Sequence, residues 1–183
     1  MVPALAAEIV DFWQEAGPGR WYAKNPDFDR SIAVRFEAAH HAAARGELAD
    51  WATSWKGALA LLLLLDQFPR NIYRGSAHAF ATDPLARTIA RAALAAGFDK
   101  LVPTELRMFV YLPFEHSELI ADQDLCLDLC ERFEAERGPS AEWARMHRDI
   151  IVRFGRFPHR NAALGRKSSA EEQAFLDQGG FAG

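Results

Sequence analysis

The sequence predicts an all-α protein, a bundle of seven to nine helices that forms a single domain over residues 1–183. Alanine and leucine recur with the spacing of one helix face, and no stretch alternates apolar and polar residues for long. Half of the residues are apolar and a quarter are charged, which is usual for a globular protein. A chain of 183 residues can bury a substantial core without disulfides or metals.

Capping and breaking residues divide the chain into the expected helices. A polar cap or an Asp-Pro pair starts a helix, and glycine or proline ends it. Helices are expected at about Ala4–Ala16, Asp27–Gly46, Trp55–Gln67, Asp83–Ala96, Thr104–Pro113 and Glu118–Arg137 (closed by Gly138-Pro139). Another is expected from Ser140 through Ile151 into the segment Arg156–Asn161, and a short one after Ser169.

Three of these helices carry specific expectations. Either Asp27 or Asp29 can cap the second helix. The helix Trp55–Gln67 is apolar almost all round, so it is expected at the centre of the bundle. Ser168 and Ser169 each precede a glutamate by three residues, the capping-box pattern that starts the terminal helix.

Two similar motifs are the best lead to a site. The first motif is Gln-Phe-Pro-Arg-Asn at Gln67–Asn71, and the second motif is Arg-Phe-Pro-His-Arg-Asn at Arg156–Asn161. Each follows an apolar run that its proline is expected to stop, because proline lacks an N–H and clashes with the preceding turn. Guanidinium groups bind carboxylate or phosphate bidentately, so two facing motifs would form an anion pocket. The predicted ligand-binding residues are Arg70, Asn71, Arg74, Arg156, Arg160 and Asn161.

A structural role for the same arginines is the alternative. Arginine after a helix end can bond the terminal carbonyl groups. Asp66 lies four residues before Arg70 and could pair with it simply to support the fold.

A second cluster, His116-Ser117-Glu118, follows Pro113. Histidine titrates near neutral pH, so His116 is the candidate general acid or base, and Glu118 could orient it or act as a second catalytic group. In the alternative, Ser117 caps the next helix, Glu118 complements its positive end, and His116 bonds the backbone.

No metal ligand and no cofactor is assigned from the sequence. His40 and His41 are adjacent and are expected to point to different faces of a helix, and His147 is expected as a core histidine. Cys126 and Cys130 lie four residues apart, which favours free thiols on one buried helix face. A Gly-x-Ser-x-Gly elbow and a glycine-rich phosphate loop are both missing from the sequence.

Charge and hydropathy restrict the partners. The net charge of −4 disfavours nucleic acid, which usually requires a basic face. The N-terminal region lacks the pattern of a signal peptide, and the apolar run Ala58–Leu65 is much shorter than a membrane span. A cytoplasmic protein without a membrane partner is therefore expected.

Three longer strings resemble those of a bacterial group, the domain-of-unknown-function family 924. They are Leu65–Arg74, Tyr111–Glu118 and Arg153–Asn161, and Asp11–Trp13 and Leu164–Arg166 fit the same family. The resemblance spans most of the chain. It implies an all-helical fold related to tetratricopeptide-like arrays, and it implies no established activity.

Two functions are therefore expected from different classes. In the first, a polar cleft of the predicted arginines, asparagines and His116 binds a small anionic or polar molecule, with or without acid/base chemistry. In the second, the chain is a helical scaffold that binds a peptide or protein along a groove. The sequence leaves open whether the protein is an enzyme.

Overall fold

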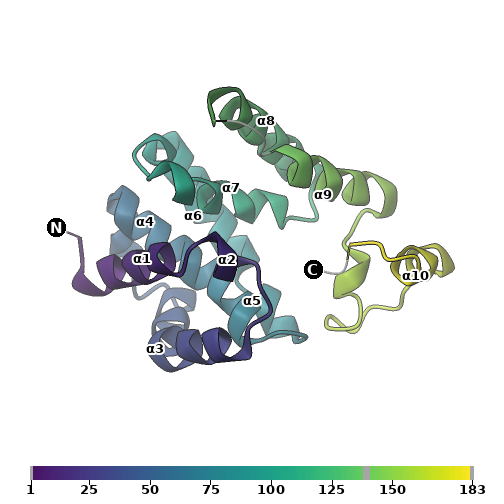
Figure 1. The fold of residues 1–183 in the computed structure, drawn as a ribbon, viewed down its shortest axis with the longest axis horizontal. Helices are drawn as coiled ribbons and strands as arrows, with labels where there is room; N and C mark the ends of the chain where they lie inside the picture. Colours follow the sequence, from purple (N-terminus) through teal and green to yellow (C-terminus); the bar gives the residue numbers. More distant parts are fainter. Residues whose placement is uncertain (1, 138–140, 182–183) are drawn as a thin grey trace. The chain divides into compact units, whose positions relative to one another are not determined.

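The computed structural model describes residues 2–137 and 141–181, and within them every regular element is a helix or a helical turn. The all-α prediction is confirmed (Figure 1). The α-helices are α1 Ala4–Ala16, α2 Pro18–Trp21, α3 Pro26–Ala44, α4 Trp55–Leu62, α5 Phe68–Ile72, α6 Asp83–Ala95, α7 Met108–Glu115, α8 Ile120–Arg137, α9 Ala141–Phe154 and α10 Ala170–Asp177. The shorter turns are η1 Ala49–Thr53, η2 Leu63–Gln67, η3 Ala77–Phe80, η4 Phe98–Lys100, η5 Thr104–Leu106 and η6 Pro158–Arg160.

The chain divides into two compact units. The first unit comprises Met1–Arg74 and His78–Pro113, and the second comprises Gly75–Ala77 and Phe114–Gly183. The boundary near Pro113 falls inside α7. That the whole chain behaves as a single domain stays a prediction.

The leucine-rich helix lies in the core of the first unit, as predicted. Every residue from Gly57 to Leu62 in α4 is buried, and Leu63, Leu64 and Leu65 are 0% exposed. Helix α4 contacts α1 and α6, and α5 contacts α3 (Figure 1). A helix surrounded in this way needs apolar side chains on almost all its faces, which agrees with its almost entirely apolar sequence.

The prediction that Pro69 ends this helix is wrong. The chain continues through η2, a π-helical turn, into α5, and the Phe68 N–H bonds the Leu63 carbonyl across the wider turn. In a π-helix residue 69 would donate its N–H to the Leu64 carbonyl, and in an α-helix to the Leu65 carbonyl. Pro69 has no N–H, so it can bond neither carbonyl. Side chains replace it: His40 Nδ1 lies 2.8 Å from the Leu64 oxygen, and Thr82 Oγ1 donates to Leu65 at 2.6 Å.

Two further predicted proline breaks are also wrong. Helix α9 ends at Phe154 because Gly155 follows with a φ of 69°, a conformation that glycine adopts readily. Pro158 instead begins the η6 turn. Helix α7 continues through Pro113 to Glu115, since a proline this close to the end of a short helix removes only one of its last bonds.

The caps of two helices show where local rules succeed and fail. Asn25, rather than Asp27 or Asp29, caps α3, and its side chain accepts the backbone N–H groups of Asp27 and Phe28. Pro26 occupies the first helical position, which makes the residue before it the cap. The predicted capping box of α10 is confirmed with Ser169 and Glu172.

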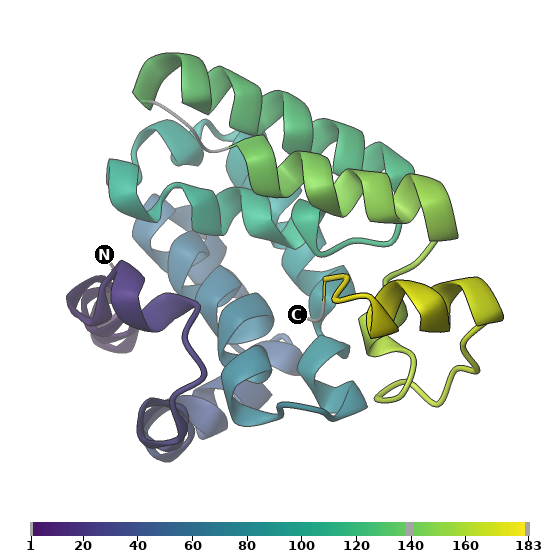
Figure 2. The same ribbon diagram turned by 45° about the vertical axis from the view of Figure 1, so that its right-hand side comes forward.

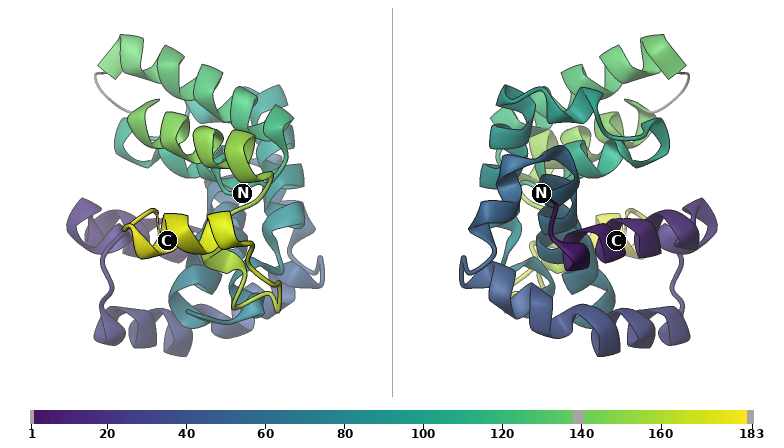
Figure 3. Two further views of the ribbon diagram at one scale, coloured as in Figure 1. Left: turned by 90° about the vertical axis from the view of Figure 1, so that its right-hand side faces the viewer. Right: turned by 90° about the vertical axis from the view of Figure 1, so that its left-hand side faces the viewer.

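The second unit contains an antiparallel pair, α8 and α9, which lie side by side (Figure 2). Helix α10 packs beside η6 (Figure 3). Cys126 and Cys130 are buried and are not joined by a disulfide, as expected, and their Sγ atoms lie 3.9 Å apart. The predicted breaks at Gly138-Pro139 and the predicted start at Ser140 lie outside the described residues.

None of the helices in the described ranges is both long enough and apolar enough to cross a membrane.

Candidate functional site

Arg70 of the first motif is held by two carboxylates. Its Nη1 donates to the Asp66 carbonyl at 2.6 Å and to Asp83 Oδ1 at 2.9 Å, and its Nη2 donates to Asp83 Oδ2 at 3.0 Å. The Asp66 carboxylate lies 3.2 Å away, and both aspartates are buried. Burial alone would lower the pKa of Arg70, but Asp66 and Asp83 raise it above its ordinary value. The expected structural pair of Asp66 and Arg70 is therefore present.

The other two ligand candidates of the first unit share one partner, Asp29 of α3. Asn71 Nδ2 donates to Asp29 Oδ1 at 2.8 Å. Arg74 donates to the same carboxylate through Nε at 2.6 Å and Nη2 at 3.0 Å. The first motif is thus tied to α3 by a charge-assisted, bidentate contact.

In the second motif, Arg156 and Asn161 converge on Glu172. Arg156 donates to both carboxylate oxygens, at 2.6 and 2.7 Å, and to the Lys167 carbonyl at 3.0 Å. Asn161 Nδ2 reaches Glu172 Oε2 at 3.3 Å and Ser168 Oγ at 3.1 Å. The Arg156 hydrogen bonds lower the pKa of Glu172 to about 2, although burial opposes the shift.

Glu118 belongs to the same part of the second unit. Its carboxylate accepts the Phe157 N–H at 2.9 Å and a bidentate contact from Arg166 at 2.7 and 2.9 Å. Burial would raise the pKa of Glu118, but Arg166, the Phe157 N–H and nearby Arg160 lower it. Arg160 is 6% exposed and its guanidinium lies 4.5 Å from the centre of the Phe157 ring. An ionised carboxylate held in this way favours a positioning role over proton transfer.

We call this group of side chains the second-motif network. It brings together four residues that the sequence predicted and two that it did not assign to a site. The predicted members are Glu118, Arg156, Arg160 and Asn161, and the added members are Arg166 and Glu172.

The remaining predicted residues lie elsewhere. His116 is half-buried in the turn that follows α7. His147 is the predicted core histidine: it is 5% exposed, and its Nδ1 lies 2.8 Å from the Trp143 carbonyl oxygen. That the two motifs face each other in one pocket stays a prediction, since they belong to separate compact units.

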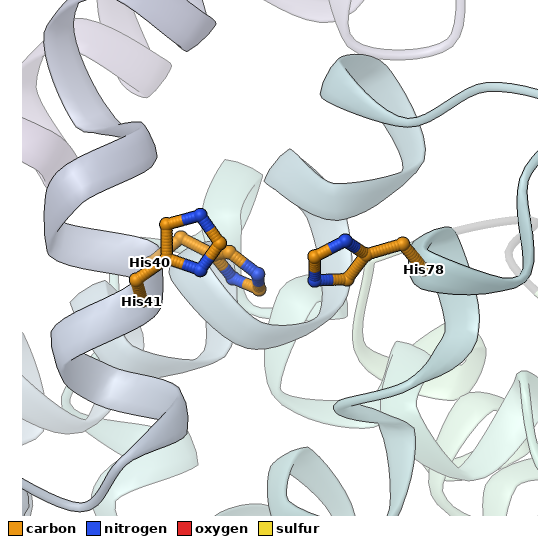
Figure 4. Close-up of side chains that lie close together, drawn as sticks. All are labelled: His40, His41 and His78. Atoms are coloured by element: carbon orange, nitrogen blue, oxygen red, sulfur yellow. The ribbon is translucent and has the colours of Figure 1, made fainter.

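Sequence reasoning missed a cluster of three histidines in the first unit. His40 and His41 come from α3 and His78 from η3, and their rings converge (Figure 4). The ring centres are 5.1, 5.7 and 5.8 Å apart, and the possible ligand atoms lie within 4.8 Å of one another. The expectation that His40 and His41 diverge is wrong, because neighbouring helix positions differ by only about 100° and both side chains can reach a group between them.

Comparison with known proteins places the chain in a family. A family model described as "Bacterial protein of unknown function (DUF924)" matches residues 9–180. The chain belongs to the DUF924 family. It is similar to the solved structure of ATU0120, a protein of unknown function from Agrobacterium tumefaciens, with 50% sequence identity and a TM-score of 0.91. The match covers 96% of this chain and 98% of that chain, and no curated protein matches. DUF924 membership thus supports the fold and leaves the function to be argued from the residues.

The low pKa of Glu172 predicts an acid-sensitive contribution to stability. The ordinary glutamate value is 4.5 and the folded value is about 2, so the contribution is complete above 4.5 and is lost as the pH falls through about 2. Glu172→Gln keeps a side chain suited to the capping box and removes the charge. We expect the variant to be less stable than wild type at neutral pH, with the difference closing in acid, as measured by urea unfolding. A difference that stays constant down to pH 2 would contradict the assignment.

Proposed function

We propose that this DUF924 protein binds a small polar or anionic molecule at the second-motif network. The observation that carries the proposal is the convergence of Glu118, Arg156, Arg160 and Asn161 in one part of the second unit. Arg156, Arg166 and Glu118 keep 31%, 23% and 28% of their side-chain surfaces exposed. Polar groups that are held in place and still reach solvent support ligand recognition.

Arg156 is the central donor in this proposal. A guanidinium has five N–H groups. The Arg156 Nε and Nη2 groups contact Glu172 and the Lys167 carbonyl, which fixes the plane of the fork. The Nη1 group of Arg156 donates no hydrogen bond to a described residue, so it is available to a ligand carboxylate or phosphate. An arginine fixed before binding loses less side-chain entropy when the ligand arrives.

The proposal also gives roles to the predicted site residues that lie outside the second-motif network. His116 would supply acid/base chemistry, since its residue type titrates near neutral pH. Arg70, Asn71 and Arg74 would contribute only if a ligand competes with their present partners Asp83 and Asp29. A helical scaffold that binds a peptide or protein is the alternative, and there the arginines would bind acidic residues of the partner. A cytoplasmic location is part of both versions.

A thermal-shift screen of phosphorylated and carboxylated metabolites tests the proposal. A ligand present at a hundredfold excess over its Kd should add about 2.7 kcal/mol to the free energy of unfolding. Arg156→Met alone would leave the buried Glu172 carboxylate without its main partner. The double variant Arg156→Met/Glu172→Gln removes both charges, so it should fold and lose the stabilisation by the ligand.

Arg153→Met is the matched control. Arg153 pairs with the exposed Glu171 at 3.0 Å and is not part of the second-motif network. Its replacement should leave the ligand effect unchanged. Stabilisation by an acidic peptide, with no response to any small anion, would support the scaffold instead. A ligand effect that persists in the double variant would refute the proposed site.

A further inference from the structure

The two ring nitrogens of His40 have different surroundings. Its Nδ1 lies 2.8 Å from the Leu64 carbonyl oxygen. A carbonyl only accepts hydrogen bonds, so Nδ1 must carry the proton and Nε2 must carry a lone pair. This Nε2 is buried and has no hydrogen-bond partner in the described part of the chain. A buried nitrogen left without a partner is costly, and its presence calls for an occupant.

The backbone around Pro69 explains why this tautomer is fixed. In the π turn the Leu64 carbonyl would accept the backbone N–H of Pro69, but proline has none. The carbonyl is therefore left to accept a hydrogen bond from His40. Histidines that bind metals usually donate their second ring N–H to a carbonyl or carboxylate, which fixes ring orientation and raises ligand basicity. Single π turns are also frequent at functional sites.

The surroundings of His40 lower its pKa. Burial, with smaller contributions from His41 and His78, lowers the pKa of His40 against the opposing effect of the Leu64 hydrogen bond. Metal ions bind the neutral form of imidazole.

Tyr73 positions the other two histidines. Its hydroxyl lies 3.2 Å from His41 Nε2 and donates to Glu37 Oε1 at 2.9 Å. Burial and the Glu37 contact raise the pKa of Tyr73 to about 12, so the phenol keeps its proton. The His78 ring stacks on the Tyr73 ring at a centroid distance of 4.0 Å and an angle of 4°.

We propose that His40, His41 and His78 bind a divalent transition-metal ion (Figure 4). The donor set contains imidazole nitrogens only, which suits Zn²⁺, Cu²⁺ and Ni²⁺ and does not suit Mg²⁺ or Ca²⁺. Zinc bonds of about 2.0–2.1 Å to nitrogen place tetrahedral ligands roughly 3.4 Å apart. Binding therefore requires the spacing of up to 4.8 Å to shorten, and His78 is the exposed one of the three side chains. Three protein ligands leave a fourth position for water or an exchangeable ligand.

Calorimetric titration with Zn²⁺ alone tests the site, on full-length protein with no affinity tag and after removal of metals by a chelator. Wild type should bind one equivalent. His78→Ala should lose at least about 100-fold in affinity, because it removes a direct ligand rather than an orienting group. Tyr73→Phe keeps the stacked ring and removes the hydroxyl, so it should lose roughly 10-fold, as expected of a positioning residue.

His159→Ala is the matched control, since His159 belongs to the second unit and packs between Phe157 and Phe181. It should bind Zn²⁺ as wild type does. Titration with Cu²⁺ adds a spectroscopic readout, because electron paramagnetic resonance detects nitrogen ligands directly. Nitrogen coupling should be present in wild type and reduced in His78→Ala. The proposal is overturned if wild type binds no Zn²⁺, or if a correctly folded His78→Ala variant binds it with unchanged affinity. In either case the three rings serve only as a packed aromatic cluster.

Discussion

Arg70→Met should destabilise the protein by about 3–5 kcal/mol, the usual cost of removing one partner from a buried ion pair. The Asp66 and Asp83 side chains are 1% and 7% exposed, so each would keep its charge in a poorly solvated place with one partner fewer. Urea unfolding followed by circular dichroism measures the difference in the free energy of unfolding.

The double variant Arg70→Met/Asp83→Asn separates charge from packing. Removing the Asp83 charge together with the guanidinium should recover part of the lost stability, since less uncompensated charge remains buried. Arg70→Lys keeps the positive charge and loses the bidentate geometry, so an intermediate value is expected. Equal stabilities for wild type and Arg70→Met would show that this ion pair contributes nothing to the fold.

Leu62→Ala should cost roughly 2–5 kcal/mol, the range for a leucine enclosed in a core. Leu62 is 1% exposed within α4, and the residues around it in this helix are buried as well. The removed methyl groups would leave a cavity that a helix packed on all faces cannot readily close. Thermal and urea unfolding both report the change.

Val34→Ala provides the surface comparison for Leu62→Ala. Val34 is 82% exposed on α3, and truncation there should stay within about 0.5 kcal/mol of wild type. If Leu62→Ala behaves like Val34→Ala, the core position of α4 is refuted.

The helices could be predicted because their signals are local. The almost entirely apolar sequence indicates the leucine-rich core helix, and the Ser169-Glu172 box marks the start of α10. The ends next to proline were predicted less well. The chain continues past Pro69 through a wider turn, and Gly155 rather than Pro158 ends α9. The general rule that proline stops a helix predicts neither result.

The candidate sites depended on contacts between distant segments, so the sequence supplied only their parts. The arginines of both motifs were identified, but their partners Asp29, Asp83 and Glu172 are distant in sequence and have no spacing relation to them. The histidine cluster was missed for the same reason. His78 comes from a separate turn, and no local metal-binding spacing joins it to the pair on α3.

The π turn before Pro69 also has a consequence for chain length. A π turn is equivalent to one extra residue in an α-helix, and η2 carries that residue between the core helix and the first motif. If the same residues formed a regular α-helix instead of the π turn, all that follows would rotate by about 100° and shift by about 1.5 Å. Arg70 and Asn71 would then leave Asp83 and Asp29, although no residue of either motif had changed. The spacing between core and motif is thus part of the information that the sequence must preserve.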